Sequence, residues 1–580
     1  MRRMTSDDAR VAAEEAAAAA AAAEEAAEAA RKKADELAKA AAAAQQQEAN
    51  AAVETEPAAE SAPPAEKPAP SDIVETVKAG YAFDGPALVI GALVDGDAVP
   101  EAQVRIPLGM LNRHGLVAGA TGTGKTKTLQ VLAEQVAAQG VPVFAADIKG
   151  DLSGIASPGV ANDKLTARST SIGQDWQPMA TPTEYFTLGG LGTGVPIRAS
   201  IESFGPLLLS KVLGLNETQE SSLGLVFHYA RKANRSLVDI GDLRSVLTYL
   251  TGDGKADLKE LGGLSAATAG VILRELIAFS DQGADVFFGQ PEIVTSDFLR
   301  TTPDGIGIVS LLEVPSVQDK PALFSTFLMY LLSQLFRELP EVGDTDKPKL
   351  VFFFDEAHLL FRDASKDFLE LVAQTVRLIR SKGVGIFFVT QTPKDVPPEV
   401  LEQLGSRVQH QLRAHTPDAA KALKATVSTY PHTSYDLEEV LTQLSIGEAI
   451  VTVMNEKGAP SPVAWTRVRA PQGSMEPTPA AQIQASVASS PLLAKYGTAV
   501  NPPSATESLD QVEAAVAAER RKKEEADRWA DEIKGHSRRE RTTRTRTSTS
   551  RRQSPVEKAA GEAGRTLARE IIKNIFRRRR

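Results

Sequence analysis

A series of short, almost continuously apolar stretches alternates with segments of helical periodicity, and this alternation restricts the chain to few architectures. A strand that is apolar throughout must be buried on both of its faces. Such strands, separated by helices, are typical of a parallel sheet covered by helices on both sides. We therefore expect an α/β fold with a parallel central sheet. The predicted strands are ALVIGALV (87–94), QVRIPL (103–108), GLVAG (115–119), VPVFAADI (141–148), GIGIVSLLE (305–313), KLVFFFDE (349–356), GVGIFFVTQ (383–391), RVQHQLR (407–413) and EAIVTVM (448–454).

Composition separates this patterned region from two low-complexity arms. Ala, Glu and Lys dominate residues 6–44. Ala is the best helix former, and the near absence of large apolar residues leaves no seam for a coiled coil, so we expect a solvated helix that frays. The expected organisation is an Ala/Glu-rich helix (1–44), a disordered linker (45–72), a main domain (73–470) with a helical insertion (200–300), a linker (471–506), a charged helix (507–534), and a basic tail ending in an amphipathic helix (535–580).

Charge is distributed unevenly along the chain. Residues 1–70 contain fourteen Asp and Glu against eight Lys and Arg, whereas residues 534–580 contain sixteen Lys and Arg against four Glu. An acidic body with a basic tail confines any contact with a polyanion to a local region. The chain has no cysteine, which excludes disulfides and thiolate metal sites and fits a reducing compartment. With no signal peptide and no integral membrane segment apparent, we expect a cytoplasmic protein.

A glycine-rich stretch follows the strand at 115–119 and fits the pattern G-x-x-x-x-G-K-[ST] in full. Glycines allow backbone N–H groups to curl around phosphate oxygens, and the helix that follows directs its positive end at them. Lys125 is expected to reach the β- and γ-phosphates, and the Thr126 hydroxyl to ligate Mg²⁺. We therefore predict a nucleotide site. Its residues are Gly119, Ala120, Thr121, Gly122, Thr123, Gly124, Lys125, Thr126 and Lys127.

Two carboxylates, Asp355 and Glu356, emerge from the apolar strand LVFFF. Ligands of open parallel sheets bind at the carboxyl ends of the strands. Asp355 is expected to hold Mg²⁺ through water, and Glu356 to orient or deprotonate the attacking water. An acidic pair after a strand is often only a surface turn, but its combination with the phosphate loop favours a catalytic role. The glutamate also favours hydrolysis over phosphoryl transfer to a small acceptor.

Two further features bear on catalysis. Thr390 and Gln391 end the next predicted strand, where the Gln391 amide could sense the γ-phosphate or position water. An arginine that neutralises charge on the transferred phosphoryl group is also required. Any one arginine is more often part of a surface ion pair, so the choice stays open at this stage. The candidates are Arg377, Arg380, Arg407 and Arg413.

Taken together, several segments resemble the HerA/FtsK branch of additional-strand P-loop ATPases, and more narrowly a bacterial HerA-like subgroup. The resemblance covers about residues 75–470 and excludes both arms. It rests on GLVAGATGTGKT, AADIKGDLSG, LVFFFDEAHLLF, VRLIRSKGVGIFFVTQ and GSRVQHQLRAHTPDAAKAL.

The resemblance implies a RecA-like core that binds ATP and Mg²⁺, a hexameric ring, and movement of double-stranded DNA through the pore. By motif, Lys125 and Thr126 do the work of Walker A, Asp355 and Glu356 that of Walker B, and Gln391 is the sensor. Arg380 falls where HerA-type proteins place an interface arginine, and Arg407 is the second choice. The segment Asp147, Lys149 and Asp151 also matches the family pattern D-x-K-G-D.

Two classes of function remain open. The first is an ATP-driven, helicase-like DNA motor, with a nuclease or another protein as partner. The second is an assembly factor gated by nucleotide, with slow ATPase activity that is independent of DNA. The glutamate favours the motor, whereas the long insertion and the arms favour the assembly factor. A related motor acting on proteins or pili ranks below both. Residues 535–555 interleave Arg with Ser and Thr and contain no aromatic residue, which is equally consistent with phosphate contact and with a solvated charge run. The acidic N-terminal arm is a candidate competitor with DNA for the basic tail.

Overall fold

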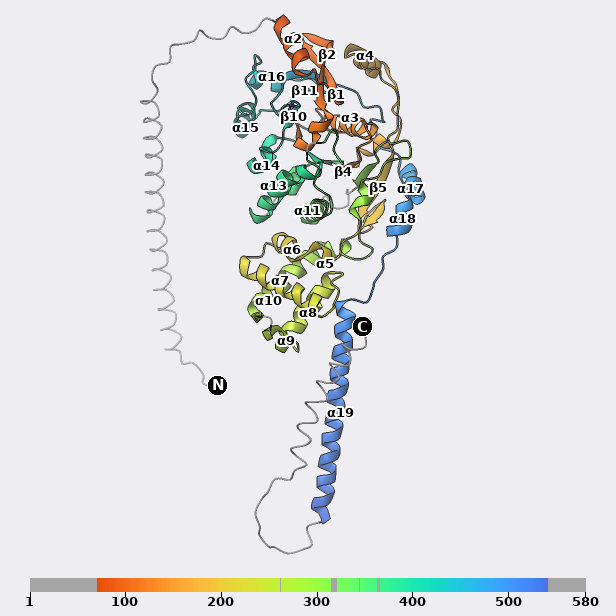
Figure 1. The fold of residues 1–580 in the computed structure, drawn as a ribbon, viewed down its shortest axis with the longest axis vertical. Coiled ribbons are helices and arrows are strands. Elements are labelled where there is room, and N and C mark those ends of the chain that lie inside the picture. The colour runs from red at the N-terminus through yellow and green to blue at the C-terminus, as the bar shows by residue number, and fades with distance from the viewer. Residues whose placement is uncertain (1–69, 261, 314–320, 344, 362–365, 541–580) are drawn as a thin grey trace, which may run out of the picture. The chain divides into compact units, whose positions relative to one another are not determined.

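The computed structural model describes residues 70–260, 262–313, 321–343, 345–361 and 366–540 (Figure 1). Its strands are β1 Ala87–Asp95, β2 Asp97–Pro107, β3 Gly115–Ala118, β4 Val143–Asp147, β5 Thr183–Leu188, β6 Val195–Ile197, β7 Val309–Glu313, β8 Leu350–Phe354, β9 Val384–Thr390, β10 Ser406–Gln409, β11 Glu448–Thr452 and β12 Ala464–Val468. Its α-helices are α2 Pro70–Gly80, α3 Lys125–Ala138, α4 Asp163–Ser171, α5 Ile201–Phe204, α6 Pro206–Val212, α7 Glu217–Lys232, α8 Ile240–Thr251, α9 Lys255–Glu260, α10 Ala266–Asp281, α11 Pro321–Glu338, α12 His358–Phe361, α13 Lys366–Ile379, α14 Pro398–Leu401, α15 Pro417–Val427, α16 Leu437–Gln443, α17 Ala480–Ser489, α18 Pro491–Tyr496 and α19 Ala505–Glu540. Short 3₁₀ helices are η1 Leu108–Arg113, η2 Ser153–Ala156, η3 Ala284–Val286, η4 Thr295–Phe298, η6 Arg380–Lys382 and η7 Pro393–Asp395.

One sheet of twelve strands, in the order β2-β1-β12-β11-β10-β3-β9-β8-β4-β7-β5-β6, organises the described residues. All pairs from β10 to β6 are parallel. The four strands on the other side pair antiparallel. The parallel centre confirms the predicted α/β fold. Parallel strands all end at one edge of the sheet, so the residues that follow β3, β9, β8 and β4 come together there.

Alternate residues of the central strands enter two separate cores. In β8, Phe352 and Phe354 join one core, whereas Val351 and Phe353 join the other. Helices α11 and α13 supply side chains to the first core, and α3 to the second. Burial on both faces explains why these strands are apolar throughout, since a polar residue on either side would lose its contact with water.

The sheet is wider and more mixed than the apolar runs predict. β5, β6 and β12 were not expected from the sequence. β6 has three residues, and the predicted pattern of continuous apolar residues is absent from TEYFTL in β5 and AWTRV in β12. β12 alternates buried and half-buried residues, as expected for a strand in the antiparallel part of a sheet.

Residues 200–300 contain helices α5 to α10, which pack against one another (Figure 1). Side-chain caps mark their starts: the Asn216 side chain accepts a hydrogen bond from the Gln219 N–H, and Gln219 reciprocates in a capping box at α7. Apolar residues of these helices, including Leu223, Leu247 and Ile272, belong to the same core as α11 and α13. The insertion is therefore packed onto one face of the central domain through a shared core.

The segment 471–506 differs from the linker that its composition predicts. Helix α17 packs against β5, and α18 packs against β6. Tyr496 is fully buried, and its backbone oxygen accepts a hydrogen bond of 2.9 Å from Arg198 Nη1. Farther along, the Ser504 hydroxyl and the Thr506 N–H both donate to Asp242 at the start of α8. Ordered packing can be supplied by a few anchoring residues, so a high content of Pro and Ala does not by itself indicate a free linker.

Helix α19 begins against α8 and includes the charged helix expected at 507–534. The predicted N-terminal helix and linker, and the tail beyond Glu540, lie outside the described residues. Within the described ranges, no helix combines the length and the apolar character that are needed to cross a bilayer.

Candidate active site

The phosphate loop leaves β3 and is held by the strands on both sides of it. The Gly119 N–H donates to the Thr390 oxygen of β9 at 3.2 Å, and the Ala120 N–H donates to the Gln411 oxygen, after β10, at 2.8 Å. Gly124 caps α3 with a φ of 114°, a conformation that favours glycine. Gly119 permits a close approach, because a Cβ there would lie 2.5 Å from the Cβ of His410. The loop is thus fixed at the start of α3, whose free N–H groups form an anion site.

The three residues at the start of α3 point in different directions. Lys125 is buried, and its Nζ donates to the Ala120 oxygen across the loop at 3.2 Å. Burial lowers the pKa of Lys125. Thr126 is half-buried beside it. The Lys127 side chain turns away, since its Nζ donates to the Met475 oxygen at 2.7 Å. The ammonium group of Lys127 is therefore engaged away from the loop.

Asp355 and Glu356 follow β8 at the same edge of the sheet and are only 3% and 5% exposed. Burial raises the pKa of Asp355 to about 7. Burial also acts to raise the pKa of Glu356, but a hydrogen bond and ion pair with Lys149 outweigh it, so the pKa is lowered. The second carboxylate oxygen of Glu356 lies 3.2 Å from Nδ1 of His358. Glu356 has a φ of 48°, which is uncommon for a residue with a side chain.

A third carboxylate, Asp147, ends β4, the other neighbour of β8. One oxygen accepts the N–H groups of Lys149 and Gly150, and the other accepts that of Leu152 at 2.8 Å. These bonds fold the segment after β4 into a turn that returns Asp151 to the site. Burial raises the pKa of Asp147 to about 6.

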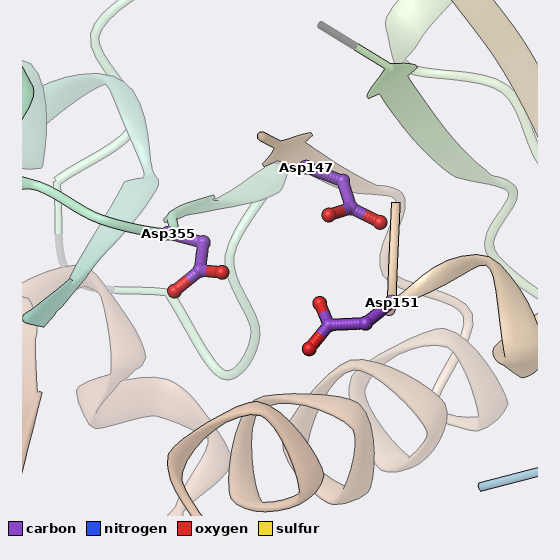
Figure 2. Close-up of side chains that lie close together, drawn as sticks. All are labelled: Asp147, Asp151 and Asp355. Carbon is purple, nitrogen blue, oxygen red and sulfur yellow. The ribbon is translucent and has the colours of Figure 1, made fainter. Parts of the chain in front are cut away.

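Asp147, Asp151 and Asp355 form a cluster in which one carboxylate oxygen from each lies within 4.8 Å of the others. Figure 2 shows the three side chains directed toward one another. Oδ1 of Asp151 is buried and accepts no hydrogen bond. Carboxylate oxygens are ligands that Mg²⁺ prefers. The residues present therefore fit a magnesium ion held next to the phosphate loop.

Gln391 lies where the sequence predicts, directly after β9 and between the strands that carry the phosphate loop and the acidic pair. Its side chain is exposed. The preceding Thr390 is buried, and its hydroxyl donates to Asp395 Oδ2 at 2.8 Å. Asp395 also accepts the Thr392 N–H at 2.9 Å, which fixes the turn that follows Gln391.

The candidate arginines are spread over the domain. Arg380 is exposed and precedes β9, at the edge of the sheet opposite the phosphate loop. Arg407 lies within β10, where its Nη1 donates to the Thr429 hydroxyl at 2.5 Å. Arg377, on α13, is also exposed. Arg413 alone among the four has a contact with the loop, since its Nη2 donates to the Thr121 oxygen at 3.3 Å.

The sequence analysis assigned no role to five side chains of the site. Asp147, Lys149 and Asp151 were noticed only through the resemblance. His358 and Glu313 were not noticed, although Glu313 ends β7 opposite Asp147 and burial raises its pKa to about 7. A signal existed for Glu313 and the segment after β4, because both follow a buried strand in the same way as the acidic pair after β8. His358 had no such signal.

The comparison with protein families decides the relationship. The model of the protein family described as "Helicase HerA-like C-terminal" matches residues 93–579 of this chain. The chain belongs to this HerA-like helicase family. A probable helicase of Methanocaldococcus jannaschii is 25% identical over 59% of this chain and 64% of its own length. The DNA double-strand break repair helicase HerA of Saccharolobus solfataricus is 23% identical over 65% of this chain and 68% of its own length.

The HerA-like chain thus spans about two thirds of the length of these relatives. Among solved structures, the conjugative coupling protein TrwB without bound nucleotide aligns with 70% of this chain and 93% of its own, at 16% identity and a TM-score of 0.47. VirB4 of Thermoanaerobacter pseudethanolicus aligns with 67% of this chain and 97% of its own, at 14% identity and a TM-score of 0.41. We rest the family assignment on the match to residues 93–579.

Proposed function

We propose that the protein binds ATP with Mg²⁺ and hydrolyses it. One observation carries the proposal: β3, β9 and β8 are consecutive in the sheet, so Lys125, Gln391 and Glu356 lie at one edge. The residue types suit the three tasks of binding phosphate, orienting water and accepting its proton. The plasmid coupling protein TrwB, a structural neighbour, has been solved in complex with a non-hydrolysable ATP analogue.

The hydrolysis follows from these positions. Lys125 and the N–H groups of the loop would bind the phosphates, and Thr126 and Asp355 would hold Mg²⁺, with Asp147 and Asp151 in the same carboxylate cluster as Asp355. A bound Mg²⁺ neutralises charge that develops on the phosphate oxygens. Gln391 orients a water molecule, and Glu356 accepts its proton as the water oxygen bonds to the γ-phosphorus. The bond from that phosphorus to the bridging oxygen breaks, and ADP and phosphate are released.

We further propose that hydrolysis drives movement along double-stranded DNA by a homo-oligomeric ring, which the family suggests to be hexameric. The relatives named as DNA double-strand break repair helicases support DNA as the track. The basic residues beyond Glu540 offer phosphate contacts that need no base sequence. A nuclease or another protein partner, and a cytoplasmic location, stay predictions from the sequence.

The assembly-factor alternative has one structural observation in its favour. Glu356, the proposed proton acceptor, is paired with Lys149. If Lys149 restrains Glu356, ATP hydrolysis is slow, and nucleotide acts on the protein mainly through its binding. The two functions differ in whether DNA accelerates hydrolysis.

The test is the steady-state ATPase rate with and without double-stranded DNA. For a motor, we expect a severalfold rise in kcat with DNA. We expect Glu356→Gln to lower kcat at least about 100-fold, because general acid–base catalysis contributes roughly 10²–10⁴ to the rate. Lys125→Ala should also abolish turnover, by removing a phosphate contact.

Each outcome is informative. Turnover that depends on Glu356 but ignores DNA would favour the assembly factor. Turnover that survives Glu356→Gln unchanged would overturn the proposed chemistry. A fluorescent ATP analogue titrated into both variants separates binding from hydrolysis, since Glu356→Gln should still bind and Lys125→Ala should bind weakly.

A further inference from the structure

The ion pair between Lys149 and Glu356 joins the turns after two neighbouring strands. β4 and β8 pair in parallel, with Ala146 opposite Phe354, so the two turns emerge side by side. Lys149 Nζ donates to Glu356 Oε1. Glu356 Oε2 lies 3.2 Å from His358 Nδ1. Of the two carboxylate oxygens of the proposed proton acceptor, Oε1 is therefore held by Lys149, whereas Oε2 is buried and accepts no hydrogen bond.

The two partners differ in how firmly they are held. The Glu356 side chain is 6% exposed, whereas that of Lys149 is 41% exposed. The backbone beneath Lys149 is fixed, because Asp147 accepts three N–H groups of its turn. The Lys149 side chain, unlike its backbone, is therefore free to move. It can turn into solvent or toward another anion without unfolding the turn.

Lys149 also lies close enough to Lys125 for the two ammonium groups to repel each other. A triphosphate bound to the loop would add several negative charges close to Lys125. Opposite charges within a few ångströms in a partly desolvated site attract strongly, so the γ-phosphate competes with Glu356 for Lys149.

We propose that Lys149 is a positioning residue that restrains Glu356 until nucleotide is bound. Without nucleotide, Lys149 holds the carboxylate and keeps it from a water molecule. The γ-phosphate draws the ammonium group away, and Glu356 is released to orient water. This inference rests on the proposed hydrolysis and concerns the regulation of the same site.

The first test compares Lys149→Met with Lys149→Arg. A partly exposed ion pair shifts an equilibrium by up to about fivefold, so Lys149→Met should raise the DNA-free kcat by roughly three- to fivefold with little change in KM. Lys149→Arg should keep the low basal rate, because it retains the charge. Lys495→Met is the matched control: Lys495 also forms a partly exposed ion pair, with Asp297, away from the site, and this variant should leave the rate unchanged.

A basal kcat that falls or stays the same in Lys149→Met would overturn the proposal. So would an equal rise in Lys149→Arg, because the restraint would then not depend on charge.

The second test does not depend on turnover. Lysines are methylated reductively with ¹³C, and the Lys149 signal is assigned by its loss in Lys149→Arg. We expect this signal to shift in Glu356→Gln without nucleotide, and again in the wild type when a non-hydrolysable ATP analogue and Mg²⁺ are added. A signal that ignores the bound analogue would overturn the proposal. If the wild type lacks ATPase activity but the signal moves, the hydrolysis fails and the nucleotide-dependent release of Glu356 stands.

Discussion

At the scale of single residues, the site concentrates acidic groups that are costly to bury. Asp147, Glu313 and Asp355 are withdrawn from water, and burial raises the pKa of each, to about 6, 7 and 7. A carboxylate whose pKa is raised in the folded state lowers the stability of the fold as the pH rises from its ordinary pKa to the raised value. Functional sites commonly carry such a penalty, and a bound cation relieves it.

Because burial of the ionised Asp355 carboxylate is costly, we expect Asp355→Asn to be more stable than the wild type when neither Mg²⁺ nor nucleotide is present. The folded-state pKa of about 7 lies above the ordinary value of 3.8, so the folded state binds more protons between these values and wild-type stability falls as the pH rises through this window. Asn stays neutral. The gain should be at most on the order of 4 kcal/mol at pH 8, since the shift from 3.8 to about 7 spans roughly three pKa units and each unit corresponds to about 1.4 kcal/mol.

The measurement is the thermal unfolding midpoint of the wild type and of Asp355→Asn in EDTA, at pH 8 and at pH 5. The difference between the two midpoints should be smaller at pH 5. A variant that is less stable than the wild type at pH 8 would show that Asp355 contributes favourable contacts that exceed its burial penalty. Added Mg²⁺ and nucleotide should raise the midpoint of the wild type more than that of the variant.

At the scale of elements, the central strands could be predicted because burial on both faces leaves a continuous apolar run, as in LVFFF of β8. The loop residues and the acidic pair followed from position, since each comes directly after such a strand. The short strand β6 and the half-buried β12 carry no comparable pattern. Lys149 could not be assigned a role because its partner Glu356 is more than two hundred residues away in sequence.

The packing of the segment 471–506 against the sheet can be tested at Tyr496. Tyr496 is buried where α18 meets β6, its hydroxyl donates to Asp297, and that hydroxyl oxygen accepts the Val294 N–H at 3.1 Å. Tyr496→Ala should destabilise the protein by about 3–5 kcal/mol, the range for removal of a buried aromatic side chain. Thermal unfolding checks this value.

Val500→Ala is the control for Tyr496→Ala, because Val500 is 55% exposed in the same segment and its backbone hydrogen bond to Gln290 is kept. Its effect should stay within about 0.5 kcal/mol. If both variants unfold at the wild-type temperature, the segment is not anchored and the compositional expectation of a linker would be right.

At the scale of the whole molecule, the positions of Arg380 and Lys125 at opposite edges of the sheet bear on assembly. Arg380 precedes β9, whereas Lys125 follows β3, its parallel neighbour. An arginine placed in this way cannot reach the phosphates of its own chain through the packed sheet. If it acts as the sequence predicts, it does so on the nucleotide of an adjacent subunit.

We therefore expect Arg380→Ala to lower kcat at least about 100-fold with little change in nucleotide affinity, since an arginine finger contributes roughly 10³–10⁵. Mixing Arg380→Ala subunits with Lys125→Ala subunits should restore part of the activity, because an intact loop then meets an intact arginine. The ATPase rate across mixing ratios checks this. No recovery at any ratio would place the arginine in the same chain, with Arg413 as the next candidate because it contacts the loop.

The order of the strands along the chain also bears on the stage of synthesis at which nucleotide can bind. β3 ends at Ala118, but the strands on either side of it, β9 and β10, begin at Val384 and Ser406. Ribosomes add roughly 5–20 residues per second, so tens of seconds separate the synthesis of the loop from that of its frame. During that interval the glycine-rich turn exists without the backbone oxygens of Thr390 and Gln411 that accept hydrogen bonds from its N–H groups. We therefore expect nucleotide binding only after β9 and β10 have been synthesised, and a product truncated before β9 should carry the complete motif without binding nucleotide.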